Sequence, residues 1–167
     1  DYAGKKSDVQ TITISNIDTS TPADPASLSL STTAWTNADV SLILPALPAS
    51  SGAPDHYVYK TGSNDWAIVP DGFALSSNGV TTVYVAVQDE AGNRSGSLQA
   101  NARIDKLAPV IDSLDSVVSS GSCRVDLTYH EEGLSGIRSV LYAKGTQSVD
   151  YFATGGTAIS DGTFSVQ

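Results

Sequence analysis

The 167-residue sequence contains no methionine, one cysteine and only two histidines. A single cysteine, Cys123, excludes an intrachain disulfide. From Cys123 to His130 apolar and polar residues alternate, which predicts a strand that buries Cys123 as a packing thiol rather than a nucleophile. Strong helix formers are sparse while Ser, Thr, Val, Ala and Gly dominate, so the composition favours β-structure.

Positive charge is also scarce, with nine Lys and Arg residues against 18 Asp and Glu and a net charge of −9. Nucleic acids and anionic membranes select proteins with clustered cations, so neither is an expected partner. No apolar run approaches the roughly 20 residues that a membrane-spanning helix needs, so no membrane insertion is predicted for this stretch. We interpret the acidity as a source of solubility.

Apolar residues recur at every second position between turn signals, the period of a β-strand. The alternating runs predict strands near residues 28–30 and then over 40–44, 56–60, 66–69, 73–76, 80–88 and 98–104. Tyr57 and Tyr59 share a face that we expect to point into the core. About seven short strands predict an antiparallel β-sandwich of immunoglobulin type, with a closed barrel as the structural alternative.

One phrase occurs twice: an acidic glycine turn, an alternating segment, an Ile-Asp step and a proline. The aspartates of the two Ile-Asp dipeptides, Asp18 and Asp105, are 87 positions apart, and so are Pro22 and Pro109. A period of that length is one small domain and favours the sandwich over a barrel. We therefore expect the last strand and linker of a preceding repeat at residues 1–18, a complete domain at 19–105 and an incomplete second domain at 106–167.

The amino-acid sequence of the second copy resembles a known family. Residues 89–95 read Asp-Glu-Ala-Gly-Asn-Arg-Ser, a strand follows, and residues 104–109 read Ile-Asp-Lys-Leu-Ala-Pro. This resembles the bacterial immunoglobulin-like repeats of large surface proteins. The short segments Trp35-Thr-Asn and Asn64-Asp-Trp66 fit the same pattern. The resemblance covers the complete domain, the first 22 residues as a tail, and 106–167 in part. It implies tandem Ig-like β-sandwiches of about seven strands each, an extracellular location and neighbouring repeats in the same polypeptide as partners.

For function, the resemblance implies a non-enzymatic stalk or spacer of a bacterial cell-surface or secreted protein, such as an adhesin. The alternative is a glycan-binding or host-ligand-binding accessory module of an adhesin or a secreted carbohydrate-active enzyme. The binding candidates for this alternative are Trp35 and Trp66, because exposed aromatic rings stack on sugars.

Catalytic motifs are lacking. His56 and His130 are interpreted as surface residues, and no Gly-x-Ser-x-Gly turn accompanies them. Glu131 and Glu132 are neighbours that a strand would point to opposite faces, which does not suit a pair of glycosidase carboxylates. We therefore expect no enzymatic activity.

Calcium is the one cofactor that the residues suggest. Asp89 and Asp105 at a domain junction, with Asp18 in the earlier copy, could supply hard oxygen ligands. The competing interpretation is that Asp89 and Asn93 cap a tight turn while Gly92 takes a positive φ. The lack of Asp-x-Asp-x-Asp spacing favours the turn, so no cofactor is expected and calcium stays as the alternative.

Residues 106–167 lack a long penultimate strand and an acidic glycine turn, so we expect this part to expose apolar residues. The alternating segment 11–15 lacks a partner strand within the chain. We hypothesise that it completes a sheet in another copy by strand addition, a form of strand exchange.

Overall fold

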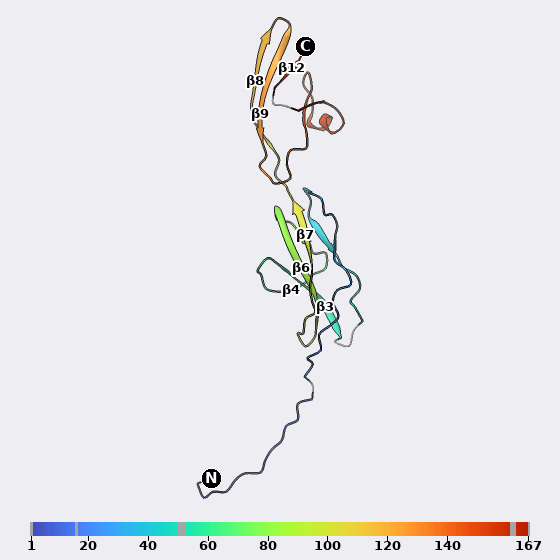
Figure 1. Ribbon diagram of the computed structural model, residues 1–167, viewed down its shortest axis with the longest axis vertical. Helices are drawn as coiled ribbons and strands as arrows, with labels where there is room; N and C mark the ends of the chain where they lie inside the picture. Colours follow the sequence, from blue (N-terminus) through green and yellow to red (C-terminus); the bar gives the residue numbers. More distant parts are fainter. Residues whose placement is uncertain (1, 16, 50–52, 161–162, 167) are drawn as a thin grey trace. The chain divides into compact units, whose positions relative to one another are not determined.

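The computed structural model describes residues 2–15, 17–49, 53–160 and 163–166, so Asp1, the first residue of the repeated phrase, lies outside the described residues. The described residues form twelve β-strands and one short 3₁₀-helix, and none of them is α-helical (Figure 1). The all-β character with several antiparallel sheets confirms the fold class at that level.

The chain divides into two compact units that alternate along the sequence. The first unit comprises residues 1–28, 44–69 and 84–99, and the second comprises 29–43, 70–83 and 100–167. The expected domains at 1–18, 19–105 and 106–167 stay a prediction.

The first sheet has three short strands in the order β1-β2-β5, namely β1 (Ser29–Leu30), β2 (Val40–Ile43) and β5 (Ala74–Leu75). Leu30 lies opposite Leu42, and Val40 lies opposite Leu75. Leu30, Val40 and Leu75 are buried, while Ser29 next to Leu30 and Ser41 next to Val40 are exposed. The alternation that predicted β1 and β2 therefore also predicts which face of each strand is buried.

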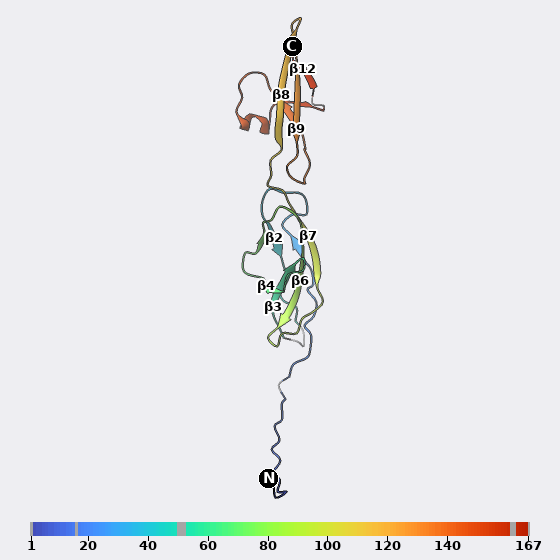
Figure 2. The same cartoon turned by 90° about the vertical axis from the view of Figure 1, so that its left-hand side faces the viewer.

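The second sheet has the order β4-β3-β6-β7 (Figure 2). Its strands are β3 (Pro54–Thr61), β4 (Ala67–Ile68), β6 (Gly79–Asp89) and β7 (Leu98–Ile104). All seven strands expected before residue 105 are present, although β4 and β5 are shorter than the runs that predicted them. The sequence pattern overestimates them because apolar residues continue past the last paired position.

The core of these strands is built on β6 and β7. Val83, Val85 and Val87 are fully buried along one face of β6, and Ala102 and Ile104 are buried at the end of β7. Burying a valine side chain stabilises a fold by about 1.5–3 kcal/mol relative to exposing it. The end of β7, where the candidate site begins, is thus fixed by core packing.

The strands after residue 109 form two further sheets, in the orders β12-β9-β8 and β10-β11. They are β8 (Val110–Ser119), β9 (Ser122–His130), β10 (Val140–Tyr142), β11 (Thr157–Ile159) and β12 (Thr163–Val166), with the 3₁₀-helix η1 (Val149–Ala153) between β10 and β11. Strands β8 and β9 are the long arrows joined by a tight turn in Figure 1.

The expectation that Cys123 is buried is only partly met. Cys123 lies in β9 opposite Val118 and Val166, but it is half-buried, and of the four alternating apolar residues only Leu127 is buried. The cause is the poorly covered β8, whose Leu114 and Val118 are 66% and 77% exposed. Exposed apolar residues in this part of the chain agree with the expectation from its sequence.

The N-terminal segment forms no strand in residues 2–15, and the side chains there are exposed. Ile12 and Ile14 are 86% and 68% exposed. Strand addition by residues 11–15 to another copy stays a hypothesis.

Candidate functional site

The most densely bonded carboxylate in the second unit belongs to Asp105, which directly follows β7 and is 9% exposed. Its Oδ1 accepts the amide N–H of Leu107 at 3.1 Å. Its Oδ2 accepts the amides of Leu134 at 2.9 Å and Ser135 at 2.8 Å, both in the loop after β9. One carboxylate thus connects the end of β7 to a loop 29 and 30 residues further along.

These hydrogen bonds change the acidity of the group. The hydroxyl and amide of Ser135, followed by the amides of Leu107 and Leu134, lower the pKa of Asp105 to about 2, against a desolvation that raises it. Hydrogen bonds to the ionised form of a carboxylate favour that form. Asp105 is therefore a fixed anion at any pH above about 4.

Gly133 makes the close approach of the loop possible. A Cβ atom on Gly133 would overlap the Asp105 carboxylate. Glycine is required at this position because of the neighbouring carboxylate, whereas its φ is not in the left-handed region.

The backbone on the other side of Asp105 is held by the segment before β2. The Asp105 amide donates to the Thr36 carbonyl at 2.8 Å, and the Thr36 amide donates to the Arg103 carbonyl at 3.2 Å. Lys106 donates its amide to Asn78 Oδ1 at 3.0 Å, and its Nζ lies 2.7 Å from Asp39. Asp105 and Lys106 are therefore hydrogen-bonded both to the loop after β9 and to residues that precede β7 in the sequence.

A pocket of about 310 Å³ opens beside Asp105. Its lining comes from the segment before β2, the end of β7 and the loop after β9, namely Trp35, Thr36, Asn37, Asp105, Ser135, Gly136 and Arg138. The structure thus brings together Trp35 and Asp105, which the sequence singled out for different reasons.

Asp89 is buried at the end of β6, in the turn predicted from the repeated phrase. Its Oδ1 accepts the amide of Asn93 at 2.7 Å, its Oδ2 accepts Asn93 Nδ2 at 3.0 Å, and Gly92 has a φ of +89°. Burial acts to raise the pKa of Asp89, but hydrogen bonds from Asn93, Gly92 and Ala91 lower it below its usual value. This is the capped turn that the sequence favoured.

Asp18 joins the same turn through its backbone. Asn93 Nδ2 also donates to the Asp18 carbonyl at 3.0 Å, so Asn93 connects Asp18 with Asp89. The Asp18 side chain accepts the amide of Ser20 at 2.9 Å, just as Asp105 accepts the amide of Leu107 two residues later. The two copies of the Ile-Asp step thus form the same local hydrogen bond.

The three calcium candidates therefore have N–H groups as hydrogen-bond partners. A carboxylate oxygen that faces an N–H donor is oriented for hydrogen bonding rather than for a cation. Across residues 2–15, 17–49, 53–160 and 163–166, no three His, Cys, Asp or Glu side chains are grouped so as to hold a metal ion.

Trp66 packs against cations. Lys60 Nζ lies 5.3 Å from the centroid of the Trp66 ring and 5.4 Å from that of Tyr84, and Arg94 Cζ lies 4.7 Å from Trp66. Tyr84 alternates with fully buried valines, so it points away from the core face of β6. Cation–π contacts with Lys60 and Arg94 therefore cover Trp66 on the outer face of β6, and its ring is half-buried.

On β3 the same alternation places Tyr57 and Tyr59 on the face opposite Val58 and Lys60. Val58 is 2% exposed while both tyrosines are half-buried, so the expectation that they point into the core stays a prediction. The Tyr57 hydroxyl donates to the Ala46 carbonyl at 3.3 Å, and burial raises the pKa of Tyr57.

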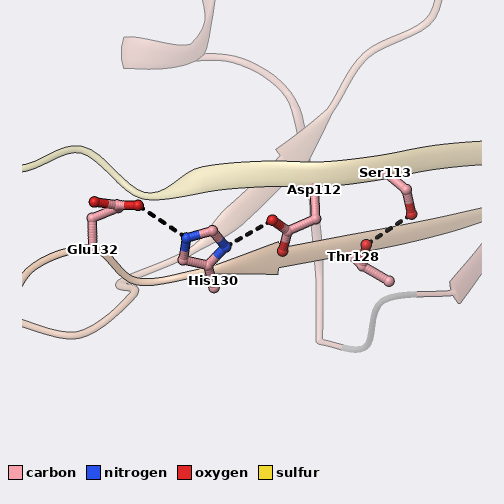
Figure 3. Close-up of polar contacts among 5 residues, drawn as sticks. All are labelled: Asp112, Ser113, Thr128, His130 and Glu132. Carbon is pink, nitrogen blue, oxygen red and sulfur yellow. Dashed lines mark hydrogen bonds and ion pairs between the residues drawn. The ribbon is translucent and has the colours of Figure 1, made fainter.

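His130 lies between two carboxylates on the β8–β9 hairpin (Figure 3). Its Nδ1 is 2.8 Å from Asp112 Oδ1, and its Nε2 is 3.1 Å from Glu132 Oε1. Hydrogen bonds that His130 makes to the carboxylates of Asp112 and then Glu132 raise the pKa of His130 above its usual value, because both favour the charged imidazolium. His56 has a similar neighbour, with Nδ1 2.7 Å from Asp55 Oδ2.

Asp112 reaches His130 because β8 has a bulge. The register runs from Ile111 opposite Tyr129 to Ser113 opposite Thr128, which leaves Asp112 without an opposite residue. A bulge re-aims the side chain of the extra residue, and here Ser113 then bonds Thr128 between hydroxyls at 2.7 Å (Figure 3). The sequence analysis interpreted His130 as a surface residue, but it gave no indication of this partner.

No protein-family model, curated protein or solved structure matches this chain. In the described part of the chain no helix is both long and apolar enough to cross a membrane. Its function is therefore inferred from its own hydrogen bonds, packing and pockets.

Proposed function

We propose that this chain is a non-enzymatic spacer segment of a bacterial cell-surface or secreted protein, with Ig-like β-sandwich modules at residues 19–105 and 106–167. The observation that carries the proposal is the Asp105 carboxylate, which accepts amides of Leu134 and Ser135. In the proposed arrangement, Asp105 ends one module and the loop belongs to the next. A spacer holds its outer parts at a fixed distance only if such a joint resists bending.

The sheet topology supports the sandwich. Seven strands divide into β1-β2-β5 and β4-β3-β6-β7, the number and grouping that an Ig-like domain needs. Both sheets have a buried apolar face, through Leu30 and Val40 in one and Val83 and Val85 in the other. Two sheets with such faces bury them most effectively against each other.

The connection after β7 is held mainly by its backbone. The Leu107 amide bonds Asp105, the Lys106 amide bonds Asn78, and Pro109 has a fixed φ. The ion pair between Lys106 and Asp39 is largely exposed and adds little, since exposed pairs contribute about 0–1 kcal/mol. A linker restrained at each of these residues favours a stiff joint over a flexible tether.

The experiment is a backbone ¹⁵N relaxation measurement on the chain and on Asp105→Ala. We expect one common rotational correlation time for β6–β7 and β8–β9 in the unsubstituted chain, and two different values in Asp105→Ala. Asp71→Ala, in an exposed turn, is the matched control and should behave as the unsubstituted chain. Independent tumbling of the two hairpins before any substitution would rule out a stiff spacer.

A further inference from the structure

The pocket beside Asp105 contains an excess of hydrogen-bond donors. The oxygens of Asp105 already accept three amides, and the Ser135 hydroxyl also bonds this carboxylate. Arg138 lines the same pocket, and among the described residues it has no ion-pair or hydrogen-bond partner. A guanidinium carries five N–H groups in a planar fork that matches a carboxylate. The Asp105 carboxylate thus already has its hydrogen bonds, while the Arg138 guanidinium is available to bind a ligand.

The opposite wall adds an aromatic ring and further polar groups. Trp35 is half-buried in the wall, and Asn37 beside it has no hydrogen-bond partner in the described part of the chain. The Thr36 hydroxyl oxygen accepts the Ala38 amide at 3.1 Å, so its O–H is free to donate. Thr36 is anchored to β7 by two backbone bonds, which places this wall before a ligand arrives.

We propose that this pocket binds an acidic sugar, with the carboxylate of the sugar on Arg138 and an apolar face of its ring against Trp35. Asn37 and Thr36 have the bonding capacity for the ring hydroxyls. The volume of about 310 Å³ lies at the lower end of the range of ligand pockets, about 300–1,000 Å³, and suits a monosaccharide unit.

The charge of the pocket distinguishes a carboxylate from a phosphate. Asp105 also lines the pocket and is ionised above about pH 4. Its negative charge repels a doubly charged phosphate more strongly than a singly charged carboxylate.

The test is a titration of the ¹⁵N-labelled chain with sodium glucuronate, followed through the indole N–H signals of its two tryptophans. Glucose and sodium chloride are the controls for the neutral ring and for salt. We expect a saturable shift of the Trp35 signal and none of Trp66, whose ring contacts Lys60 and Arg94 outside the pocket. Glucose should bind about tenfold or more weakly, because a hydrogen-bonded charge is lost.

Two arginine variants complete the test. Arg138→Gln should weaken glucuronate binding about tenfold or more and remove the preference over glucose, because the paired charge is lost. Arg94→Gln, the matched control at the other tryptophan, should leave the affinity unchanged. Equal affinity for glucose, an unaltered affinity in Arg138→Gln, or no saturable shift at tens of millimolar glucuronate would each overturn the proposal. Because the pocket is lined from both sides of the proposed joint, this proposal rests on the proposed function. The relaxation measurement tests the joint without any ligand, so a stiff joint without glucuronate binding overturns the pocket alone.

Discussion

Asp105 illustrates how one side chain organises a large part of the second unit. Its two oxygens bond amides at the start of the following linker and in the loop after β9. Because its pKa is lowered to about 2, the stabilisation from these bonds is complete above the unfolded pKa near 3.8 and is lost as the pH falls through 2. The contact therefore persists at neutral and mildly acidic pH.

Gly133→Ala tests the close packing at this residue. The added Cβ would overlap the Asp105 carboxylate, so we expect a lower Tm by differential scanning calorimetry. The control is a double-mutant cycle with Asp105→Ala, in which the smaller side chain removes the clash. The cost of Gly133→Ala should be clearly smaller in that background. Equal costs in both backgrounds would mean that the carboxylate does not require the glycine.

His130 adds a pH dependence at the residue scale. Its pKa is raised by Asp112 on β8 and Glu132 in the following loop, so the folded state binds the proton more tightly than the unfolded chain. The resulting stability is fully present below the unfolded pKa of about 6.5 and is lost as the pH rises through the higher folded value.

We therefore expect the chain to be more stable at pH 6 than at pH 8.5 and Asp112→Asn to reduce that difference. An NMR titration of the His130 ring should give a midpoint above 6.5 in the unsubstituted chain and a lower one in Asp112→Asn. Glu132→Gln should have the same direction of effect but a smaller one, since Asp112 is the stronger cause. A midpoint that neither substitution changes would contradict the bridging geometry.

At the scale of the elements, alternation located the strands that have one buried face. It predicted β2, β3, β6 and β7 because their apolar residues fall at every second position. It did not predict β8, where the bulge at Asp112 breaks the period and Val117 and Val118 are adjacent. A pattern of period two cannot reveal a strand whose register shifts within it.

A two-residue turn, Ser120 and Gly121, connects β8 to β9. Ser120 and Gly121 both have positive φ, +48° and +84°, which is the requirement of the hairpin turn that Asn-Gly fits best. Ser120→Asn should raise the free energy of unfolding by about 0.5–1 kcal/mol, because Asn tolerates the left-handed region better than Ser. Urea denaturation measures this change, and Ser119→Asn, at the end of β8, is the matched control. A lower stability of Ser120→Asn would show that the turn has a different conformation in solution.

At the scale of the whole molecule, the repeated phrase marked Asp18, Asp89 and Asp105 as special positions. The local part of their environment followed from the sequence, since Asx bonds involve residues two to four positions away. The bonds from Asp105 to Leu134 and Ser135 could not be predicted, because no local pattern indicates which distant amides a carboxylate meets. Arg138 beside Trp35 was likewise beyond a single sequence, since the fold alone brings these two residues to one pocket.

The proposed spacer needs a stiff joint after β7. The most direct measurement is the width of the distance distribution between spin labels at Ser63 and Ser116, both exposed, in a Cys123→Ser background, measured by double electron–electron resonance. We predict a single narrow distribution for this labelled chain and a markedly broader one when Asp105→Ala is added. A broad distribution before Asp105 is changed, or no broadening after it, would rule out a stiff joint held by Asp105.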